Sequence, residues 1–495
     1  MRMRFLLLLS LALVACADPD FAAPIAPLSC GERAAAGPVA ELDSLATAGV
    51  SMTMGPCGDL TYVTPDGDVM RVGPALDAPV RVAEAGAGAT FSTRGDQVMM
   101  RDTEGGVTWR RLPDGPEVRV EAGVQGFARS GDEEIAWVCG GGEIGTIDED
   151  GYRRLVGDVA TCAGAVVARA APVLLYVAPE DLLRRVRLDT GDAVDLPEVP
   201  FIAVRGDQLT LSRDGRVLIH RPVRSSQHVG IFDLGAPEGE RFLAAPELRS
   251  HAVLEAERAN HVFGVDATDG ALVLTRERWL NFYEGAQLLA LSPDGSRALL
   301  TSVSDDGTGW TYEVSDVDTL ESEPLEAPST GNLRLAGRSR DGETLALSER
   351  NVVGVTTLYR FRWDAPGLEA VPAVGRNAQV YWVGDDGSLL VHANEEEAAL
   401  LDPDGEERAR WSNVGRVDAQ STARGLLMTI RSRDWATQRI LAVRPDGTQE
   451  ALYAGQSVQR LILDRDGERV AFSVFEQDVM DPSMFQTRIF AGAVP

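Results

Sequence analysis

The dipeptide Asp-Gly occurs twelve times in this chain, and this repetition constrains the fold more than any other feature. Asp-Gly supplies the positive backbone angles that tight β-hairpins need. Apolar runs flank many of the pairs: Leu288–Leu291 precedes Ser292-Pro293-Asp294-Gly295, and Ala298–Leu300 follows it. Pairs at positions 294, 341 and 386 are 47 and 45 residues apart, which exceeds one hairpin but suits a four-stranded unit. The sequence therefore predicts repeated antiparallel units of four strands.

Two versions of the turn alternate along the chain. One has the form Ser-Pro-Asp-Gly and returns in related form at residues 339–342 and 464–467. The other ends an apolar run, as in Leu400–Gly405 and Leu441–Gly447, and residues 62–67 and 144–151 match it. We interpret the first version as the inner hairpin of a unit and the second as its outer hairpin. No amphipathic helical stretch interrupts the series, so we expect an all-β fold.

Residues 292–299, with the sequence Ser-Pro-Asp-Gly-Ser-Arg-Ala-Leu, resemble the repeat of TolB-type, WD-repeat-like β-propellers of bacterial envelopes. The resemblance covers roughly residues 57–495, is clearest after residue 284, and implies a β-propeller of four-stranded antiparallel blades, a fold that hosts many functions. At about 40–45 residues a blade, residues 57–495 give about ten units. Because common propellers have roughly four to eight blades, we expect one ring of about eight, within a range of about seven to ten. Two smaller propellers that meet near residue 280 are the alternative. We expect residues 60–72 to pair with residues 487–494 and close the ring.

The first residues predict export. Residues 1–4 contain two arginines and residues 5–15 are almost wholly apolar, which are the proportions of a secretory signal peptide. Leu13-Val14-Ala15-Cys16 resembles the bacterial lipobox, which implies cleavage after residue 15 and acylation of Cys16. Several acyl chains at one residue give stable anchoring. We therefore expect a lipoprotein signal peptide over residues 1–15 and a lipid-anchored protein of the cell envelope, at the outer membrane and facing the periplasm or the cell surface. An ordinary signal peptide followed by a chance cysteine is the alternative.

Residues 16–56 are rich in Ala, Pro and Gly and lack a sustained strand pattern. We expect them to form a tether between the anchor and the propeller, with a short helix around Ala40 to Ala48 as one option. The propeller is then expected over residues 57–495.

Four cysteines remain after Cys16: Cys30, Cys57, Cys139 and Cys162. An even number in an exported chain predicts two disulfides. The most economical of the three connectivities joins Cys30 to Cys57 and Cys139 to Cys162, and the second bond would link strands of adjacent blades. A thiol pair or metal site is the alternative, but no C-x-x-C spacing supports it.

Composition excludes several functions. All 47 basic residues are arginines, which excludes Walker-type phosphate binding, Schiff-base chemistry and a lysine general base. The 75 acidic residues leave a formal net charge of −28. This charge argues against nucleic acid, whose binding needs basic patches, and favours partners with basic or neutral surfaces.

The sequence shows few catalytic patterns. There is no G-x-S-x-G elbow, and the histidines show no metal-binding spacing; they are His220, His228, His251, His261 and His392. Three D-x-D-G sites could begin a calcium loop, although hairpin turns explain the same letters. Asp402 with Asp404 is the best candidate, because Glu406 and Glu407 add oxygens. The eight tryptophans are spread along the chain, which favours blade packing over a sugar-stacking platform.

We therefore expect a lipid-anchored envelope β-propeller that needs no cofactor and binds an envelope protein or peptide, as a scaffold rather than an enzyme. One alternative is an enzyme with its site in the central channel, such as a metal- or calcium-dependent lyase or a lactone hydrolase. A sensor of small ligands or glycans is another, and it would require exposed tryptophans on one face.

Overall fold

The computed structural model describes residues 36–47, 49–55, 57–76, 78–84, 89–91, 97–101, 105–111, 115–121, 123–130, 135–168, 171–196, 208–212, 215–221, 230–234, 240–243, 250–255, 263–267, 270–274, 280–304, 306–326, 331–350, 356–371, 378–394, 396–455, 457–464, 466–477 and 485–495. These residues belong to two compact units. Unit 1 contains those within 125–146 and 153–247, and unit 2 contains those within 36–124, 147–152 and 248–495.

The described strands form eleven antiparallel sheets of four strands each. Ten of these sheets use four consecutive strands, and one is assembled from both ends of the chain. The predicted all-β class and the β-propeller of four-stranded blades are confirmed. Ten blades are each built from four consecutive strands, a number at the upper end of the expected range. The sheet that combines strands from both chain ends comes in addition to these ten.

Unit 1 holds three blades, apart from a few residues of the first, and one short 3-10 helix, η1 (Pro179–Asp181). Their strands are β10 (Val124–Ser130), β11 (Ile135–Gly140), β12 (Glu143–Asp148), β13 (Gly151–Val156), β14 (Thr161–Val167), β15 (Val173–Val177), β16 (Leu183–Arg187), β17 (Ala193–Asp195), β18 (Gln208–Leu211), β19 (Val217–Arg221), β20 (Gly230–Asp233) and β21 (Glu240–Leu243).

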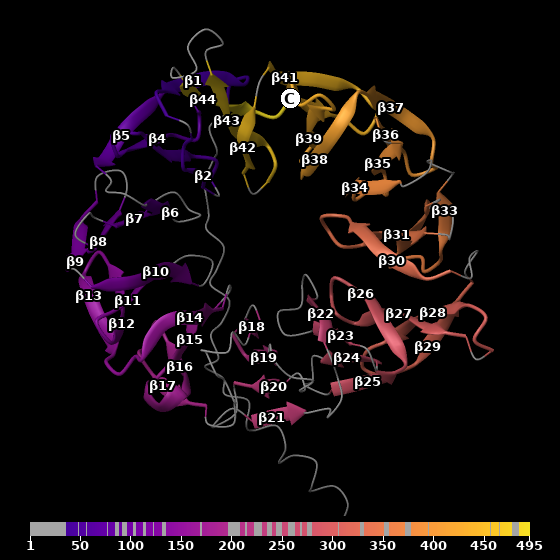
Figure 1. Ribbon diagram of the computed structural model, residues 1–495, viewed down its shortest axis with the longest axis horizontal. Helices are drawn as coiled ribbons and strands as arrows, with labels where there is room; N and C mark the ends of the chain where they lie inside the picture. Colours follow the sequence, from indigo (N-terminus) through magenta and orange to yellow (C-terminus); the bar gives the residue numbers. More distant parts are fainter. Residues whose placement is uncertain are drawn as a thin grey trace, which may run out of the picture. The chain divides into compact units, whose positions relative to one another are not determined.

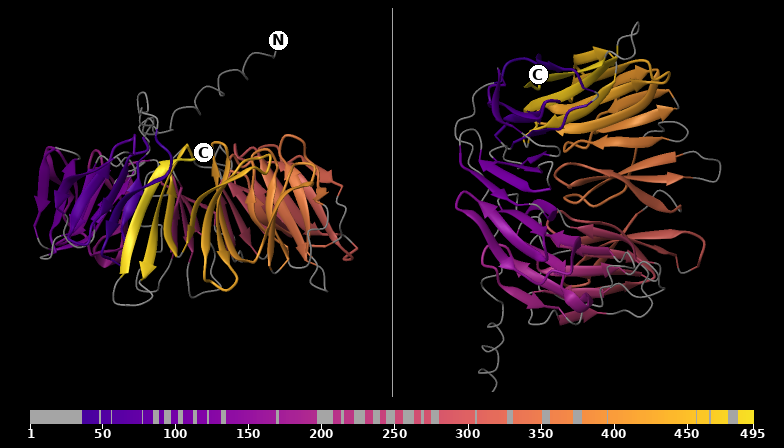
Figure 2. Two further views of the ribbon diagram at one scale, coloured as in Figure 1. Left: turned by 90° about the horizontal axis from the view of Figure 1, so that it is seen from above. Right: turned by 60° about the vertical axis from the view of Figure 1, so that its left-hand side comes forward.

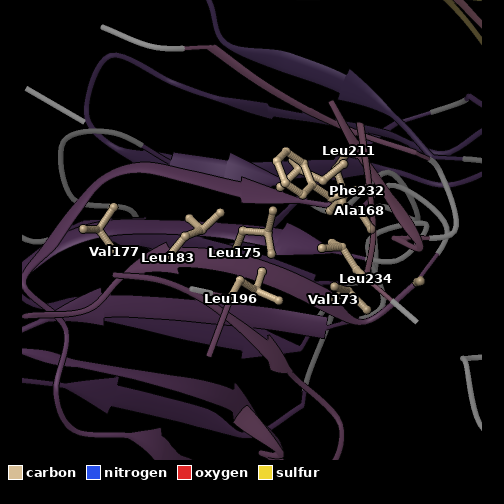
Figure 3. Packing of buried hydrophobic residues seen from close by; sticks show 11 residues of the cluster. Ala168, Val173, Leu175, Val177, Leu183, Leu196, Leu211, Phe232 and Leu234 are labelled. Carbon is tan, nitrogen blue, oxygen red and sulfur yellow. The ribbon is translucent and has the colours of Figure 1, made fainter. Parts of the chain in front are cut away.

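Apolar side chains fill the space between neighbouring blades of unit 1. Leu175 and Leu183 from the blade β14–β17 pack with Leu218 and Phe232 from the blade β18–β21, and all four are buried. Figure 3 shows the side chains of this cluster converging from both sheets. Successive side chains of a strand point to opposite faces, so each blade contributes apolar residues to the layers on both of its sides.

Unit 2 holds the other blades. Their strands are β1 (Ala40–Leu45), β2 (Met52–Met54), β3 (Leu60–Val63), β4 (Asp68–Val72), β5 (Pro79–Glu84), β6 (Ala89–Phe91), β7 (Gln97–Arg101), β8 (Val107–Arg111), β9 (Glu117–Val120), β22 (Ser250–Glu255), β23 (Phe263–Ala267), β24 (Gly270–Leu274), β25 (Leu280–Glu284), β26 (Ala286–Leu291), β27 (Arg297–Val303), β28 (Trp310–Asp316), β29 (Ser322–Leu325), β30 (Leu333–Arg338), β31 (Thr344–Arg350), β32 (Thr356–Arg362), β33 (Glu369–Val371), β34 (Gln379–Val383), β35 (Leu389–Asn394), β36 (Glu397–Leu401), β37 (Glu407–Ser412), β38 (Val414–Thr422), β39 (Gly425–Ser432), β40 (Gln438–Val443), β41 (Gln449–Gly455), β42 (Val458–Leu463), β43 (Arg469–Gln477) and β44 (Phe485–Ala493). From β26 to β44 these blades follow one another side by side (Figure 2).

The last blade of unit 2 combines strands from both ends of the chain. Its order is β1-β44-β43-β42, and β1 pairs antiparallel with β44, with Ala40 opposite Ala491 and Leu45 opposite Thr487 (Figure 1). The Tyr62 hydroxyl in the neighbouring blade donates a 2.6 Å hydrogen bond to Asp43 of β1. Burial and this hydrogen bond to Asp43 raise the pKa of Tyr62 well above its usual value. A packed and hydrogen-bonded N-terminal strand therefore completes the last blade.

This pairing corrects two predictions. The strands β1 and β2 lie inside residues 16–56, which we expected to be a tether, and β1 occupies the place of the optional helix around Ala40 to Ala48. Tertiary pairing with β44 overrides the helical preference of the local sequence. Pairing of both chain ends is confirmed, but residues 60–72 are not the partner, because they form β3 and β4 of another blade.

Most of the turn assignments are confirmed. Ser292–Gly295 joins the first and second strands of a blade, whereas Asp402–Gly405 and residues 444–447 join the third and fourth. Residues 64–67 differ from the prediction, since they join β3 to β4, the second and third strands of their blade. In the part of the chain that the structure describes, no helix has the length and apolar character needed to span a membrane.

Arginines join neighbouring blades. Arg360 of β32 is buried, and its guanidinium donates to the backbone carbonyl oxygens of Asp402, at 3.2 Å, and of Pro403 in the next blade. Arg185 of β16 donates in the same way to the carbonyl oxygen of Leu234. Five donors in a rigid fork suit arginine to such contacts, so part of the arginine content has a structural role.

Candidate binding site at the β39–β40 turn

A common turn shapes several blade ends of unit 2. Ser292, Ser304, Ser339 and Ser432 each begin a turn in which the backbone carbonyl of the serine accepts the N–H of the residue three positions later. In each turn the serine hydroxyl also donates to the aspartate two positions later, at 2.6–2.7 Å. This hydrogen bonding places the fourth residue of the turn in the left-handed region, where glycine is favoured.

Trp435 stands where the other turns have glycine. Gly295, Gly307 and Gly342 have φ angles of 72°, 69° and 76°, and Trp435 has a φ of 62° in the equivalent position. Large residues rarely adopt this conformation, and outliers of this kind cluster at functional sites. The Ser432 hydroxyl and the Ala436 amide donate hydrogen bonds to the Asp434 carboxylate. These bonds lower the pKa of Asp434 below its usual value and stabilise the turn. The turn therefore holds a strained tryptophan at the end of the blade.

Trp435 borders a small pocket. The side chain is 58% exposed, and the guanidinium carbon of Arg431 lies 4.3 Å from the centre of its ring. The pocket has a volume of about 250 Å³, and its lining residues are Arg431, Trp435, Ala436, Thr437, Gln438 and Ser457. The lining combines one aromatic face, one cation and several hydroxyl or amide groups.

Arg431 has no carboxylate partner among the described residues. Its Nε is buried, and no described group accepts a hydrogen bond from it. Arg433, two residues further on, makes an ion pair with Glu396 of the neighbouring blade. Arg431 lies in β39 and Arg433 in the turn that follows it, and of the two only Arg433 is paired with a carboxylate of the described residues.

Other apolar side chains are exposed at the same end of unit 2. With the strands of a blade called A to D in chain order, we define the B–C end as the end where B turns into C and D leads to the next blade. Val303 ends strand B of its blade, and Phe485 begins strand C of the last blade; they are 54% and 40% exposed. Phe485 lies 6.1 Å from the Phe475 ring, and the Phe475 amide donates to the backbone carbonyl of Ser457 in the pocket. Trp435, Val303 and Phe485 thus place large apolar groups at one end of the blades.

The calcium candidates lie in an ordinary hairpin turn. One oxygen of Asp402 accepts the backbone N–H groups of Asp404, at 2.9 Å, and of Glu406, at 2.8 Å, and the carboxylate pairs with Arg408 at 2.5 Å. Glu407 pairs with Arg410. No group of three or more His, Cys, Asp or Glu side chains in the described ranges is placed to hold a metal ion. The geometry of Asp402 is that of a turn stabilised by its own carboxylate.

The structure places the other singled-out residues within blades. His220 is buried in β19, and His392 in β35 contacts the Tyr381 ring at 5.8 Å. His228, His261 and Trp279 lie outside the described residues, and His251 belongs to β22. Most described tryptophans pack inside blades, as predicted; the buried ones are Trp109, Trp137, Trp363 and Trp411. Trp435 is the exception.

The disulfide between Cys139 and Cys162 is confirmed. The bond has an S–S length of 2.03 Å and links β11 to β14, which belong to adjacent blades. Cys57 is disulfide-bonded as well. Its expected partner Cys30 lies outside the described residues, as does the acylation candidate Cys16, so both assignments stay predictions.

Comparisons with known proteins add little. No protein-family model matches the chain, and no curated protein matches it. Solved structures similar to it include a Dos1 propeller, at 8% identity over 67% of this chain and 93% of that chain, with a TM-score of 0.38. Porphyromonas gingivalis dipeptidyl peptidase 4 is similar at 10% identity over 88% of this chain and 65% of that chain, with a TM-score of 0.41. A eukaryotic initiation factor is similar at 13% identity over 66% of this chain and 87% of that chain, with a TM-score of 0.36. Similarities this low carry no argument about function.

Proposed function

We propose that this protein is a lipid-anchored β-propeller of the cell envelope that binds a protein partner as a scaffold. The proposed binding of a protein partner rests on one observation. Val303 and Phe485 expose large apolar side chains at the B–C end of unit 2. Protein interfaces combine buried apolar or aromatic anchors with a polar rim. The propeller fold is consistent with such a role, since its loops leave a rigid scaffold at both ends of the blades.

The sequence supports the proposed location in the cell envelope. The basic and apolar opening residues and the lipobox-like Leu13–Cys16 support export and acylation at Cys16. The net charge of −28 supports a partner whose contact surface is basic or neutral around its apolar anchors. An envelope protein or peptide therefore suits the chain better than a nucleic acid.

Site-specific photo-cross-linking in the producing cell tests the interaction. A photoreactive residue replaces Phe485 or Val303, and the matched control replaces Val80, which is 62% exposed on the outer strand β5. We expect the first two positions to capture the same protein and the control position to capture none of it. Capture of that protein at Val80 to the same extent, or no captured protein at any position, would contradict the proposed interface.

A separate experiment tests the anchor. Metabolic labelling with a fatty acid should mark the wild-type protein, while Cys16→Ala should carry no label and leave the membrane fraction. Labelling of the Cys16→Ala variant would overturn the assignment of Cys16. The cross-linking result stands independently of this outcome.

A further inference from the structure

The geometry points to a second ligand class: we propose that the pocket beside Trp435 binds a carboxylated sugar unit of an acidic polysaccharide. This inference goes beyond the scaffold role, because its ligand is a saccharide and not a protein. Three independent features of the pocket carry it: an unneutralised cation, an exposed aromatic ring in a strained turn, and a polar lining of small volume.

The cation selects a carboxylate. Arg431 has a buried Nε without an acceptor among the described residues, and none of their carboxylates pairs with it. Nearby arginines are paired: Arg433 with Glu396, and Arg410 with Glu397 and Glu407. A guanidinium matches a carboxylate through two parallel hydrogen bonds. A ligand carboxylate would pair with the guanidinium, which no carboxylate of the described residues neutralises.

The aromatic ring selects a ligand with an apolar face. Arg431 covers part of the Trp435 ring at 4.3 Å, yet the side chain stays 58% exposed. Aromatic rings offer a flat, apolar and electron-rich surface, which suits the C–H groups on one face of a sugar ring. The guanidinium lies over one part of this ring, so a sugar that contacts the uncovered part of the ring would bring an attached carboxylate next to the guanidinium.

The remaining lining suits hydroxyl groups. Thr437 and Ser457 provide hydroxyls, and Gln438 provides a side-chain amide whose Oε1 accepts the Val458 N–H at 2.9 Å. This contact fixes the orientation of the amide and leaves its NH₂ group as a donor. A volume of about 250 Å³ lies below that of sites for larger ligands. The pocket therefore suits one monosaccharide unit of a longer chain that continues into solvent.

The turn itself does not require the tryptophan. The equivalent turns reach the same hydrogen bonding with glycine at φ angles near 70°. A tryptophan at φ 62° gains nothing for the turn itself. An acidic peptide could use Arg431, but it would not account for the ring held in this position, which is why we commit to a saccharide.

Calorimetric titration of the purified oxidised protein tests the proposal at physiological ionic strength, where salt screens the repulsion between an anionic ligand and a chain of net charge −28. The probe is a tetragalacturonate, compared with its uncharged methyl ester and with a tetraglutamate peptide. The first variant is Trp435→Gly, which introduces the residue that the equivalent turns have at this position. The second is Arg431→Met, which removes the charge and keeps an unbranched side chain. The matched control is Arg433→Met, which removes a neighbouring charge outside the pocket lining.

We expect tetragalacturonate to bind wild type, with its methyl ester at least about tenfold weaker. Trp435→Gly and Arg431→Met should each weaken binding by about tenfold or more, and Arg433→Met by about twofold at most. Absence of tetragalacturonate binding, equal binding by Trp435→Gly, an equal loss in Arg433→Met, or tighter binding of tetraglutamate would each overturn the proposal. The last result would identify a peptide site instead. Unchanged cross-linking of the protein partner at Phe485 in Arg431→Met would show that the scaffold role is separate.

Discussion

Replacing Trp435 by glycine is expected to leave the protein more stable than replacing it by alanine. At most positions the order is the reverse, because glycine gains more conformational freedom in the unfolded chain. Both substitutions remove the same ring and its contact with Arg431, which lies 4.3 Å away. Their difference therefore isolates the backbone conformation of the turn.

The magnitude follows from the φ angle of 62° at Trp435. A left-handed conformation costs an L-residue with a Cβ roughly 1–2 kcal/mol, and glycine adopts it freely. The additional unfolded-state entropy of glycine offsets about 0.4–1 kcal/mol of this difference. The glycine variant should thus exceed the alanine variant by about 1 kcal/mol in the free energy of unfolding.

Urea titration of the oxidised protein, followed by far-UV circular dichroism, measures this difference as a shift of the midpoint at constant slope. Gly307→Ala provides the matched control, since it occupies the same position of a sister turn at φ 69° and its new Cβ would meet no atom within 4 Å. It should lower the free energy of unfolding by about 1 kcal/mol. A Trp435→Ala variant as stable as Trp435→Gly would refute the argument that the turn requires glycine.

Three further predictions concern stability. Replacing Cys139 and Cys162 by serine opens a loop of 23 residues and should cost about 3 kcal/mol; dithiothreitol should lower the melting temperature of wild type more than that of the variant. Tyr62→Phe leaves the Asp43 carboxylate without its 2.6 Å hydrogen bond and should cost about 1 kcal/mol in urea titrations. The Thr308 amide and hydroxyl and the Ser304 hydroxyl lower the pKa of Asp306 to about 2, so its stabilising effect is present above the unfolded pKa and lost as pH falls towards 2. Asp306→Asn should therefore melt below wild type at pH 7, by a difference that disappears near pH 2; a constant difference across this range would contradict the assignment.

The blade architecture could be predicted because each hairpin carries its own local signal. Asp294-Gly295 and Asp446-Gly447 supply turn chemistry that depends on neighbouring residues alone. Strand β1 gives no such signal, since Ala40–Leu45 becomes a strand only by pairing with β44 from the other end of the chain. Long-range pairing of this kind leaves no local pattern, so the boundary at residue 57 was wrong.

The binding pocket was only partly visible in the sequence. Residues 432–435 read Ser-Arg-Asp-Trp, so the departure from Ser-x-Asp-Gly at Trp435 was a signal that a comparison of the turn phrases could have found. The state of Arg431 could not be predicted. The pairing of an arginine depends on which carboxylates a neighbouring blade brings close, as Glu396 is brought to Arg433, and no local pattern shows this.

Unit 2 is proposed to bind a protein through its B–C end, and this binding is expected to require no metal. The most direct test measures binding and bound metal in one purified sample, with the protein captured at Phe485 titrated into wild type and into the double variant Val303→Ser/Phe485→Ser. We expect one partner molecule per chain, a loss of affinity of about tenfold or more in the variant, and no stoichiometric metal. Stoichiometric metal together with unchanged partner affinity in the variant would contradict the account.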